Sequence, residues 1–239
     1  MRTDVIDRDR LRRWRGLAAD FLFPPRCAVC AADGALLCDD CRAAFTPAVL
    51  PRCPRCWDPS DDPAASVCDR CRREPPSLRS LRAAFVFEGA ARRAVLAVKY
   101  QSLTATAAPM LDVADLSGLA TDLDLVTAVP MPGGRRRRRG HNQAAVFGRL
   151  LADRVGRPFD ERALRRRRRT PQQVRQPNRA ARLANVRGAF AADPARVHDR
   201  AVLVVDDVTT SGATLNACAE VLLSAGAASV DGWAVSRED

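Results

Sequence analysis

The order of apolar and polar positions divides the chain into two kinds of region. From residue 81 onward, short apolar runs of strand length alternate with longer segments whose apolar residues recur at helical spacing. The predicted strands are 83–87, 125–129, 201–205 and 228–235, and the predicted helices are 90–100, 104–116, 142–155, 178–185 and 213–225. Strands that alternate with helices indicate a parallel sheet with helices packed on it, so the predicted fold class is α/β.

The first third of the chain has a different pattern. Residues 24–76 are rich in Pro, Arg, Asp and Cys and offer little material for a conventional core, so a bound metal would have to replace it. Residues 1–23 carry apolar side chains at helical spacing and predict an amphipathic helix, which we expect to pack on its own protein rather than anchor in a membrane. We therefore expect three parts: the helix at 1–23, a cysteine-rich module at 24–76 and an α/β domain at 77–239.

Eight of the nine cysteines form four C-x-x-C pairs, and Cys218 stands alone in a later helix. Two such pairs supply the four thiolates of a tetrahedral zinc site, which leaves no open position for catalysis. The sequence thus predicts two structural zinc ions, held by pairs that combine either in sequential order or interleaved. Disulfides would need a secretory route, which the N-terminus does not indicate, and an iron–sulfur cluster is the other alternative. The ligands are Cys27, Cys30, Cys38, Cys41, Cys53, Cys56, Cys68 and Cys71.

The apolar run at 201–205 is followed by the chain's most informative chemistry. It ends in two adjacent carboxylates, Asp206 and Asp207, and a turn rich in hydroxyls comes before the next predicted helix. Ligands of parallel sheets bind outside the carboxyl ends of the strands, and backbone N–H groups at a helix N-terminus attract phosphate. The alternative is a strand–turn–helix unit whose acids only cap the helix. The turn consists of Thr209, Thr210, Ser211, Gly212, Ala213 and Thr214.

Charge and hydropathy add less. The net charge of +11 favours polyanionic partners, nucleic acid or phosphorylated substrates. Lys99 is the only lysine, however, and an excess of arginine and alanine is also what a GC-rich coding sequence produces. No apolar run approaches the roughly 18–20 residues of a membrane span. The N-terminus lacks the apolar centre of a signal peptide, so we expect a cytoplasmic protein.

A second functional segment follows the predicted strand at 125–129. It runs from Pro130 and Met131 through five consecutive arginines to a predicted helix start. A charge run of this kind, like the second one at 165–169, is most often a mobile solvated loop. The helix begins with His141, Asn142 and Gln143.

The stretch from Asp206 to Thr214 resembles the binding motif for 5-phosphoribosyl 1-pyrophosphate (PRPP) of type I phosphoribosyltransferases, with Ser211 in the usual threonine place. The resemblance implies that the two acids hold the ribose hydroxyls, and that residues 209–214 hold the 5′-phosphate. It also implies a Mg²⁺ ion held mainly by the substrate. In purine-salvage relatives an acid stands in the place of Thr210, so this chain is unlike the hypoxanthine/guanine type.

Over most of its length the chain is similar to the ComF/GntX-like family, which joins a double zinc ribbon to a type I phosphoribosyltransferase domain. The likeness extends from about residue 20 to 236 and includes the R-G-[aromatic]-N-Q pattern at 139–143, the Lys99-Tyr100 pair, T-x-x-Q at 170–173 and R-x-x-N-V at 182–186. His141 departs from the family, which more often has an aromatic residue there, and simple packing is its favoured role. The resemblance implies that the pyrophosphate loop comprises Pro130, Met131, Arg138 and Arg139, and that Lys99, His141, Asn142 and Gln143 lie nearby.

Two classes of function remain open on the sequence. One is a transferase of nucleoside metabolism that uses PRPP on an unidentified acceptor. The other is a non-catalytic protein that keeps the PRPP pocket and binds nucleic acid or protein, since the resemblance implies a link to DNA uptake in competence for some members. Its partner would be single-stranded DNA or a competence helicase. Few aromatic residues are free for stacking on bases, which counts against single-strand binding.

Overall fold

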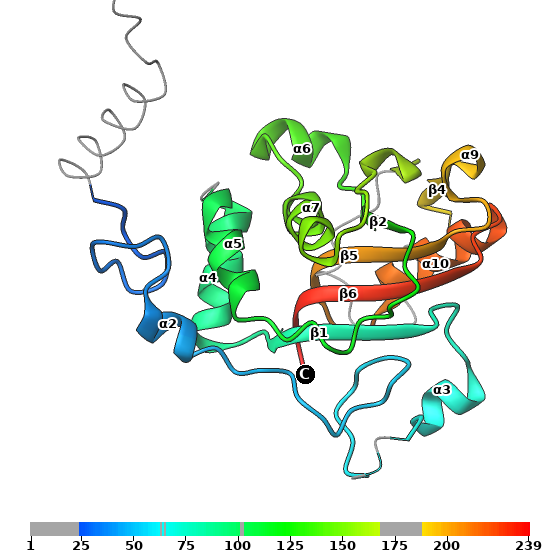
Figure 1. Cartoon of the computed structure of the whole chain (residues 1–239), viewed down its shortest axis with the longest axis horizontal. Coiled ribbons are helices and arrows are strands. Elements are labelled where there is room, and N and C mark those ends of the chain that lie inside the picture. The colour runs from blue at the N-terminus through cyan, green and yellow to red at the C-terminus, as the bar shows by residue number, and fades with distance from the viewer. Residues whose placement is uncertain (1–23, 63, 65, 101–102, 168–187) are drawn as a thin grey trace, which may run out of the picture.

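A four-stranded parallel sheet forms the centre of the molecule. The structure, a computed structural model, describes residues 24–62, 64, 66–100, 103–167 and 188–239. The sheet has the order β1-β6-β5-β2, and every neighbouring pair is parallel (Figure 1). The prediction of a parallel α/β sheet is confirmed. Its strands are β1 Ser80–Val86, β2 Leu125–Ala128, β5 Ala201–Thr209 and β6 Ser229–Arg237.

Helices cover both faces of this sheet because side chains alternate between the faces along each strand. One face buries Leu203, Val205 and Trp233 against α4, α5 and α7. The other buries Val202 and Val204 against α10. The bounds of these helices are α4 Gly89–Tyr100, α5 Ala107–Asp112, α7 Gln143–Val155 and α10 Ala213–Ser224.

Most predicted elements are present, with shifted ends. The single helix expected at 104–116 is the short 3₁₀ helix η1 Thr104–Thr106 followed by α5, which ends at Asp112. The Asp115 carboxylate accepts a hydrogen bond from the backbone N–H of Ser117 at 2.9 Å, and such local bonds compete with helix continuation. The strand expected to end at 205 continues to Thr209, because Asp206 and Val208 still pair with β6.

Several short elements were not predicted. The arginine run forms a helix, α6 Gly133–Arg139, rather than the loop we expected, and Gly140 ends it in the left-handed conformation with φ +78°. Beyond the sheet, β3 Leu164–Arg166 and β4 Phe190–Ala192 make a small antiparallel pair between η2 Glu161–Ala163 and α9 Pro194–Val197. Strands of three residues are too short for a periodic pattern to identify them.

The cysteine-rich module has two short helices, α2 Asp39–Ala43 and α3 Asp69–Arg73. The segment between its halves runs antiparallel along the edge strand β1. There the Ala48 N–H donates to the Ala84 carbonyl at 2.9 Å, and the Val86 N–H donates to the Thr46 carbonyl at 2.9 Å. The module is therefore joined to the sheet by backbone hydrogen bonds as well as by the chain.

Some sequence-based expectations lie outside the described residues. These are the amphipathic helix at 1–23, the helix at 178–185 and the motifs at 170–173 and 182–186. Among the helices that the structure describes, none has the length and apolar character needed to cross a membrane.

Candidate functional site

The cysteines gather into two groups of four, each from consecutive pairs. The Sγ atoms of Cys27, Cys30, Cys38 and Cys41 lie within 4.8 Å of one another, and so do those of Cys53, Cys56, Cys68 and Cys71. All eight thiols are free of disulfides. The two pairing schemes open on the sequence are thereby decided in favour of the sequential one.

In both groups, a short helix begins just after the third cysteine and contains the fourth. Cys38 and Cys68 are the N-caps of α2 and α3, and their backbone N–H groups donate to the Sγ atoms of Cys27 at 3.5 Å and Cys53 at 3.4 Å. Burial disfavours the thiolate of Cys53, but N–H groups of Cys68, Arg55 and Cys56 outweigh it and lower its pKa to about 6. N–H groups lower the pKa of Cys27 to about 6 in the same way.

These groups fit zinc. Tetrahedral coordination with Zn–S bonds of about 2.3 Å places the sulfur atoms about 3.8 Å apart. The Sγ atoms of Cys30 and Cys38 are 3.6 Å apart, and those of Cys56 and Cys68 are 3.8 Å apart. Four thiolates supply a complete ligand set, so the two groups fit structural zinc ions and leave no position for a substrate.

The acid pair lies near the carboxyl end of β5, in the middle of the sheet. The ammonium nitrogen of Lys99, at the end of α4, lies 3.1 Å from Oδ2 of Asp207. The Asp206 Oδ1 accepts from the Asp207 N–H at 2.9 Å, and the Asp207 Oδ1 accepts from the Val208 N–H at 2.7 Å. Burial and the charge of Asp207 raise the pKa of Asp206 to about 8. Two adjacent carboxyl groups thus share one nearby ammonium group.

The turn after β5 has the form that the sequence predicts for an anion site. Gly212 is the N-cap of the twelve-residue helix α10 and has φ +74°, a conformation that favours glycine. The Ser211 Oγ is buried and has no hydrogen-bond partner among the described residues. Thr209 closes the strand, and Ala213 begins the helix. Thr210 and Thr214 both make contacts within the protein.

Two hydrogen bonds fix the backbone at the start of the loop that follows β2. The buried Asn142 donates from Nδ2 to the Val129 carbonyl at 3.1 Å, and the Val129 N–H donates to the Val205 carbonyl at 2.9 Å. These bonds fix the backbone just before Pro130 and Met131 beside the strand that carries the acids.

His141 and Gln143 join this region to the end of α4. The His141 ring packs with Nδ1 2.9 Å from the Arg139 carbonyl and Nε2 3.0 Å from the Val98 carbonyl, while Gln143 Nε2 donates to the Lys99 carbonyl at 3.3 Å. Arg139 stacks on Tyr100, with 4.5 Å from its guanidinium carbon to the ring centre. The helix with Lys99 and the arginine helix α6 are therefore fixed relative to each other. Arg138 is exposed on α6.

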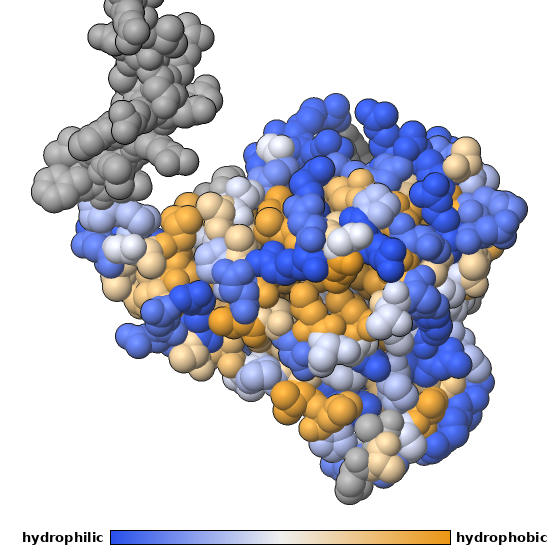
Figure 2. Space-filling view, in the orientation of Figure 1, coloured by the Kyte–Doolittle hydropathy of each residue, from blue (hydrophilic) through white to orange (hydrophobic). Residues whose placement is uncertain are grey.

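A groove of about 800 Å³ opens next to this loop, in the region of α6 and α9, where mostly hydrophilic residues cover the face seen in Figure 2. Arg166 lies close enough to Asp206 for their charges to interact, and burial lowers the pKa of its guanidinium. The arginine run at 165–169 predicted a solvated loop, so Arg166 was not among the predicted site residues. Pro130, Met131 and Asn142 line the groove, together with six arginines against three carboxylates: Arg136, Arg149, Arg162, Arg165, Arg166 and Arg196, and Asp160, Glu161 and Asp193.

Comparison with known proteins gives two family matches. Residues 18–72 match the double zinc ribbon domain, and residues 141–235 match the phosphoribosyl transferase domain. The DNA utilization protein YhgH of Salmonella typhi is 30% identical over 210 residues, covering 84% of this chain and 90% of the relative. The Escherichia coli K12 protein of the same name is 29% identical over 209 residues, with the same coverage.

Among solved structures, the glutamine PRPP amidotransferase of B. subtilis is 25% identical over 54% of this chain and 25% of its own, with a TM-score of 0.36. The two domain matches follow each other in the order of the family suspected from the sequence, and the YhgH proteins align along most of the chain. The chain belongs to the ComF/GntX-like family, in which a double zinc ribbon is joined to a phosphoribosyl transferase domain.

Proposed function

We propose that the chain binds PRPP together with Mg²⁺ at the carboxyl end of β5 and transfers its ribose 5-phosphate to an acceptor. The observation that carries this proposal is the pairing of an acid site with an anion site on one strand–turn–helix unit. Asp206 and Asp207 lie near the end of β5, just before the turn, and Gly212 is the N-cap of α10. Sugar hydroxyls suit the acids, and a phosphate suits the turn.

In this proposal the turn holds the 5′-phosphate. The backbone N–H groups at the start of α10 would donate to the phosphate, as at other helix N-termini. The Ser211 hydroxyl, which has no partner among the described residues, would donate to a phosphate oxygen. The two carboxyl groups accept hydrogen bonds from the ribose 2′ and 3′ hydroxyls. Lys99 remains beside Asp207 and limits the repulsion between the acids.

The pyrophosphate of PRPP would lie along the loop at Pro130 and Met131, toward the arginine-lined groove. During transfer the bond from ribose C1 to the pyrophosphate oxygen breaks, the leaving group keeps the electron pair, and the acceptor forms the new bond to C1. Positive charge develops on the sugar and negative charge on the leaving group. Guanidinium groups fixed near the leaving group stabilise that separation of charge. Bound together with PRPP, Mg²⁺ would supply positive charge to the leaving group, and the substrate would provide most of its ligands.

Titration calorimetry with PRPP and Mg²⁺ tests the binding site. The wild type is expected to bind, and the double variant Asp206→Asn/Asp207→Asn to lose most of its affinity. The matched control is Asp39→Asn/Asp40→Asn, which removes two adjacent exposed acids in the first turn of α2. Release of pyrophosphate across a panel of nucleobases then tests turnover. A wild type that does not bind PRPP contradicts the whole proposal.

The groove favours a second candidate function, binding of single-stranded nucleic acid. Its excess of arginine over carboxylate suits a phosphate backbone, and the YhgH relatives are named for DNA utilization. Phosphate contacts predict a steep loss of affinity as salt rises. Binding of a fluorescent oligonucleotide, measured over a salt series on wild type and Arg162→Ala/Arg165→Ala, tests this. A flat salt dependence or unchanged affinity in the variant excludes the groove as the DNA site.

A further inference from the structure

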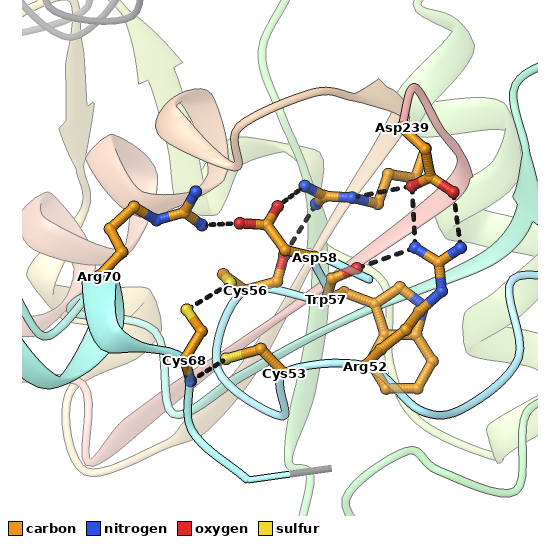
Figure 3. A network of polar contacts seen from close by, with 9 residues as sticks. Arg52, Cys53, Cys56, Trp57, Asp58, Cys68, Arg70 and Asp239 are labelled. Carbon is orange, nitrogen blue, oxygen red and sulfur yellow. Dashed lines mark hydrogen bonds and ion pairs between the residues drawn. The ribbon is translucent and has the colours of Figure 1, made fainter. Parts of the chain in front are cut away.

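The second thiol cluster is joined to the end of β6 by the buried side chain of Arg237, which is 3% exposed. Its Nη1 donates to the carbonyl of Cys56 at 2.8 Å, and its Nη2 pairs with the Asp58 carboxylate. Asp58 also pairs with Arg70 at 2.5 Å, and Arg70 lies in α3 between Cys68 and Cys71 (Figure 3). One guanidinium therefore contacts the first C-x-x-C turn of this cluster directly and the second through Asp58.

A second guanidinium also connects the loop at 52–58 to the residues that follow β6. Arg52 is buried and binds both carboxylate oxygens of Asp239, at 2.8 and 2.6 Å (Figure 3). It also donates to the carbonyl of Trp57 at 3.0 Å. Bidentate pairs of this kind fix orientation as well as distance. The loop at 52–58 and the residues that follow β6 are thus held as one unit.

The same end of β6 is hydrogen-bonded to Thr209, just before residues 210–214, which we call the phosphate turn. Arg237 is paired in register with Thr209, the last residue of β5, and the Glu238 N–H donates to the Thr209 carbonyl at 2.9 Å. The backbone that positions Arg237 is therefore also the backbone that holds Thr209.

The chain leaving the cluster reaches the other side of the turn. Six residues after Cys71, the Ser77 N–H donates to the side-chain oxygen of Asn216 at 2.7 Å. The Asn216 N–H in turn donates to the Gly212 carbonyl at 2.8 Å. The residues on either side of the turn, Thr209 before it and Asn216 after it, are consequently bonded to segments that adjoin the second cluster.

The first cluster has different neighbours. Within the described part of the chain, Cys27 and Cys41 belong to the apolar core formed with Ala90 and Ala94 of α4. That core lies on the sheet face opposite to α10. The contacts of the two clusters therefore lead to different parts of the domain.

We propose that Arg237 is a positioning residue through which zinc at the second cluster holds the phosphate turn in its binding shape. The inference rests on the proposed function for the identity of the anion, but the mechanical link does not. Zinc bound by Cys53, Cys56, Cys68 and Cys71 fixes the Cys56 carbonyl and Asp58, and these fix Arg237. Coupling between two sites is reciprocal, so PRPP at the turn also has to strengthen zinc binding at the second cluster.

Hydrogen exchange of peptides covering 206–216 tests the link without a ligand. The full-length chain is compared with Arg237→Met, and with Arg42→Met as the control, because Arg42 pairs with Asp39 in the first cluster. With two zinc ions bound in each protein, we expect exchange in 206–216 to be roughly tenfold faster in Arg237→Met and unchanged in Arg42→Met, within the usual range of coupling. Unchanged exchange in Arg237→Met overturns the proposal. If that variant does not fold, Asp58→Asn replaces it, because this variant keeps the hydrogen bond from Arg237 to the Cys56 carbonyl. Its exchange in 206–216 is expected to be faster than in wild type, by a smaller factor.

Zinc release to a chelator tests reciprocity. In the Cys30→Ser variant, which keeps only the second cluster intact, PRPP with excess Mg²⁺ is expected to slow zinc release several-fold. Adding Arg237→Met is expected to abolish this slowing while zinc and PRPP both still bind. A purely structural role for Arg237 would not produce this loss of coupling. Slowing that persists without Arg237 also overturns the proposal. A wild type that does not bind PRPP contradicts the proposed function instead, and the exchange result then stands alone.

Discussion

The ammonium group of Lys99 lies 3.1 Å from Asp207 and ties the end of α4 to the strand that carries both acids. Burial lowers the pKa of this lysine, but the charges of Asp207 and Asp206 outweigh burial and raise it. The only lysine in the chain is therefore a charged partner of the acid pair.

Replacing this lysine is expected to destabilise the fold. In Lys99→Met two adjacent carboxyl groups lose their counter-charge, and we expect a loss of about 1–3 kcal/mol in the free energy of unfolding. Urea denaturation of the zinc-loaded protein measures it. Lys99→Arg keeps the positive charge, and its loss in the free energy of unfolding is expected to be smaller. Equal losses in the two variants would mean that the charge is not what matters at this position.

The raised pKa of Asp206, about 8, predicts a pH dependence of stability. An unfolded aspartate has a pKa of about 3.9, so between about pH 4 and 8 the folded chain binds more protons than the unfolded chain. The contribution of Asp206 to stability is therefore fully present below about pH 4 and is lost as pH rises toward 8.

Asp206→Asn removes this dependence. Relative to wild type, the variant is expected to gain at least about 1 kcal/mol between pH 5 and pH 8. Urea denaturation at several pH values measures the difference. Parallel pH profiles of the two proteins would contradict the raised pKa.

Metal analysis is expected to find two zinc ions per chain. Cys30→Ser and Cys68→Ser should each retain close to one, because each removes a ligand from a different cluster. Cys218→Ser is the matched control, since Cys218 is buried in α10 and belongs to neither cluster, and it should retain two. Loss of both ions from either single cluster variant would show that the clusters do not bind independently.

Gly212→Ala is expected to damage the phosphate turn. The φ of Gly212, +74°, disfavours any residue with a side chain, and an added Cβ would lie 3.1 Å from a methyl carbon of Leu81. We expect a loss of about 1–2 kcal/mol in stability together with weaker PRPP binding. Gly133→Ala is the control because Gly133 has open space around it and no positive φ. The same denaturation series checks both, and equal stability in the two variants would contradict the conformational argument.

The sequence predicted the parts of the fold that local patterns determine. Strand 201–205, the acids after it and Gly212 are consecutive, so periodicity and turn chemistry were sufficient to predict a phosphate corner there. The two zinc clusters followed from C-x-x-C spacing, because each turn aims both thiolates at one point. Which pairs combine depends on how the loops fold, and only the structure decided it.

Contacts between distant residues had no local signal. Arg237 and Cys56 are 181 positions apart, and Arg52 and Asp239 are 187 apart. Each of these arginines resembles the many solvated arginines of a basic chain until the fold buries it. The same holds for Arg166, whose place near Asp206 depends on a three-residue strand that has no periodic pattern.

PRPP binding at the turn after β5 underlies the proposed function, and a crystal structure of the chain with PRPP and Mg²⁺ tests it. We expect the 5′-phosphate on residues 210–214, with a hydrogen bond from the Ser211 hydroxyl, and the ribose hydroxyls on Asp206 and Asp207. PRPP bound in the arginine groove with the turn empty, or absent from the crystal at saturating concentration, would contradict it.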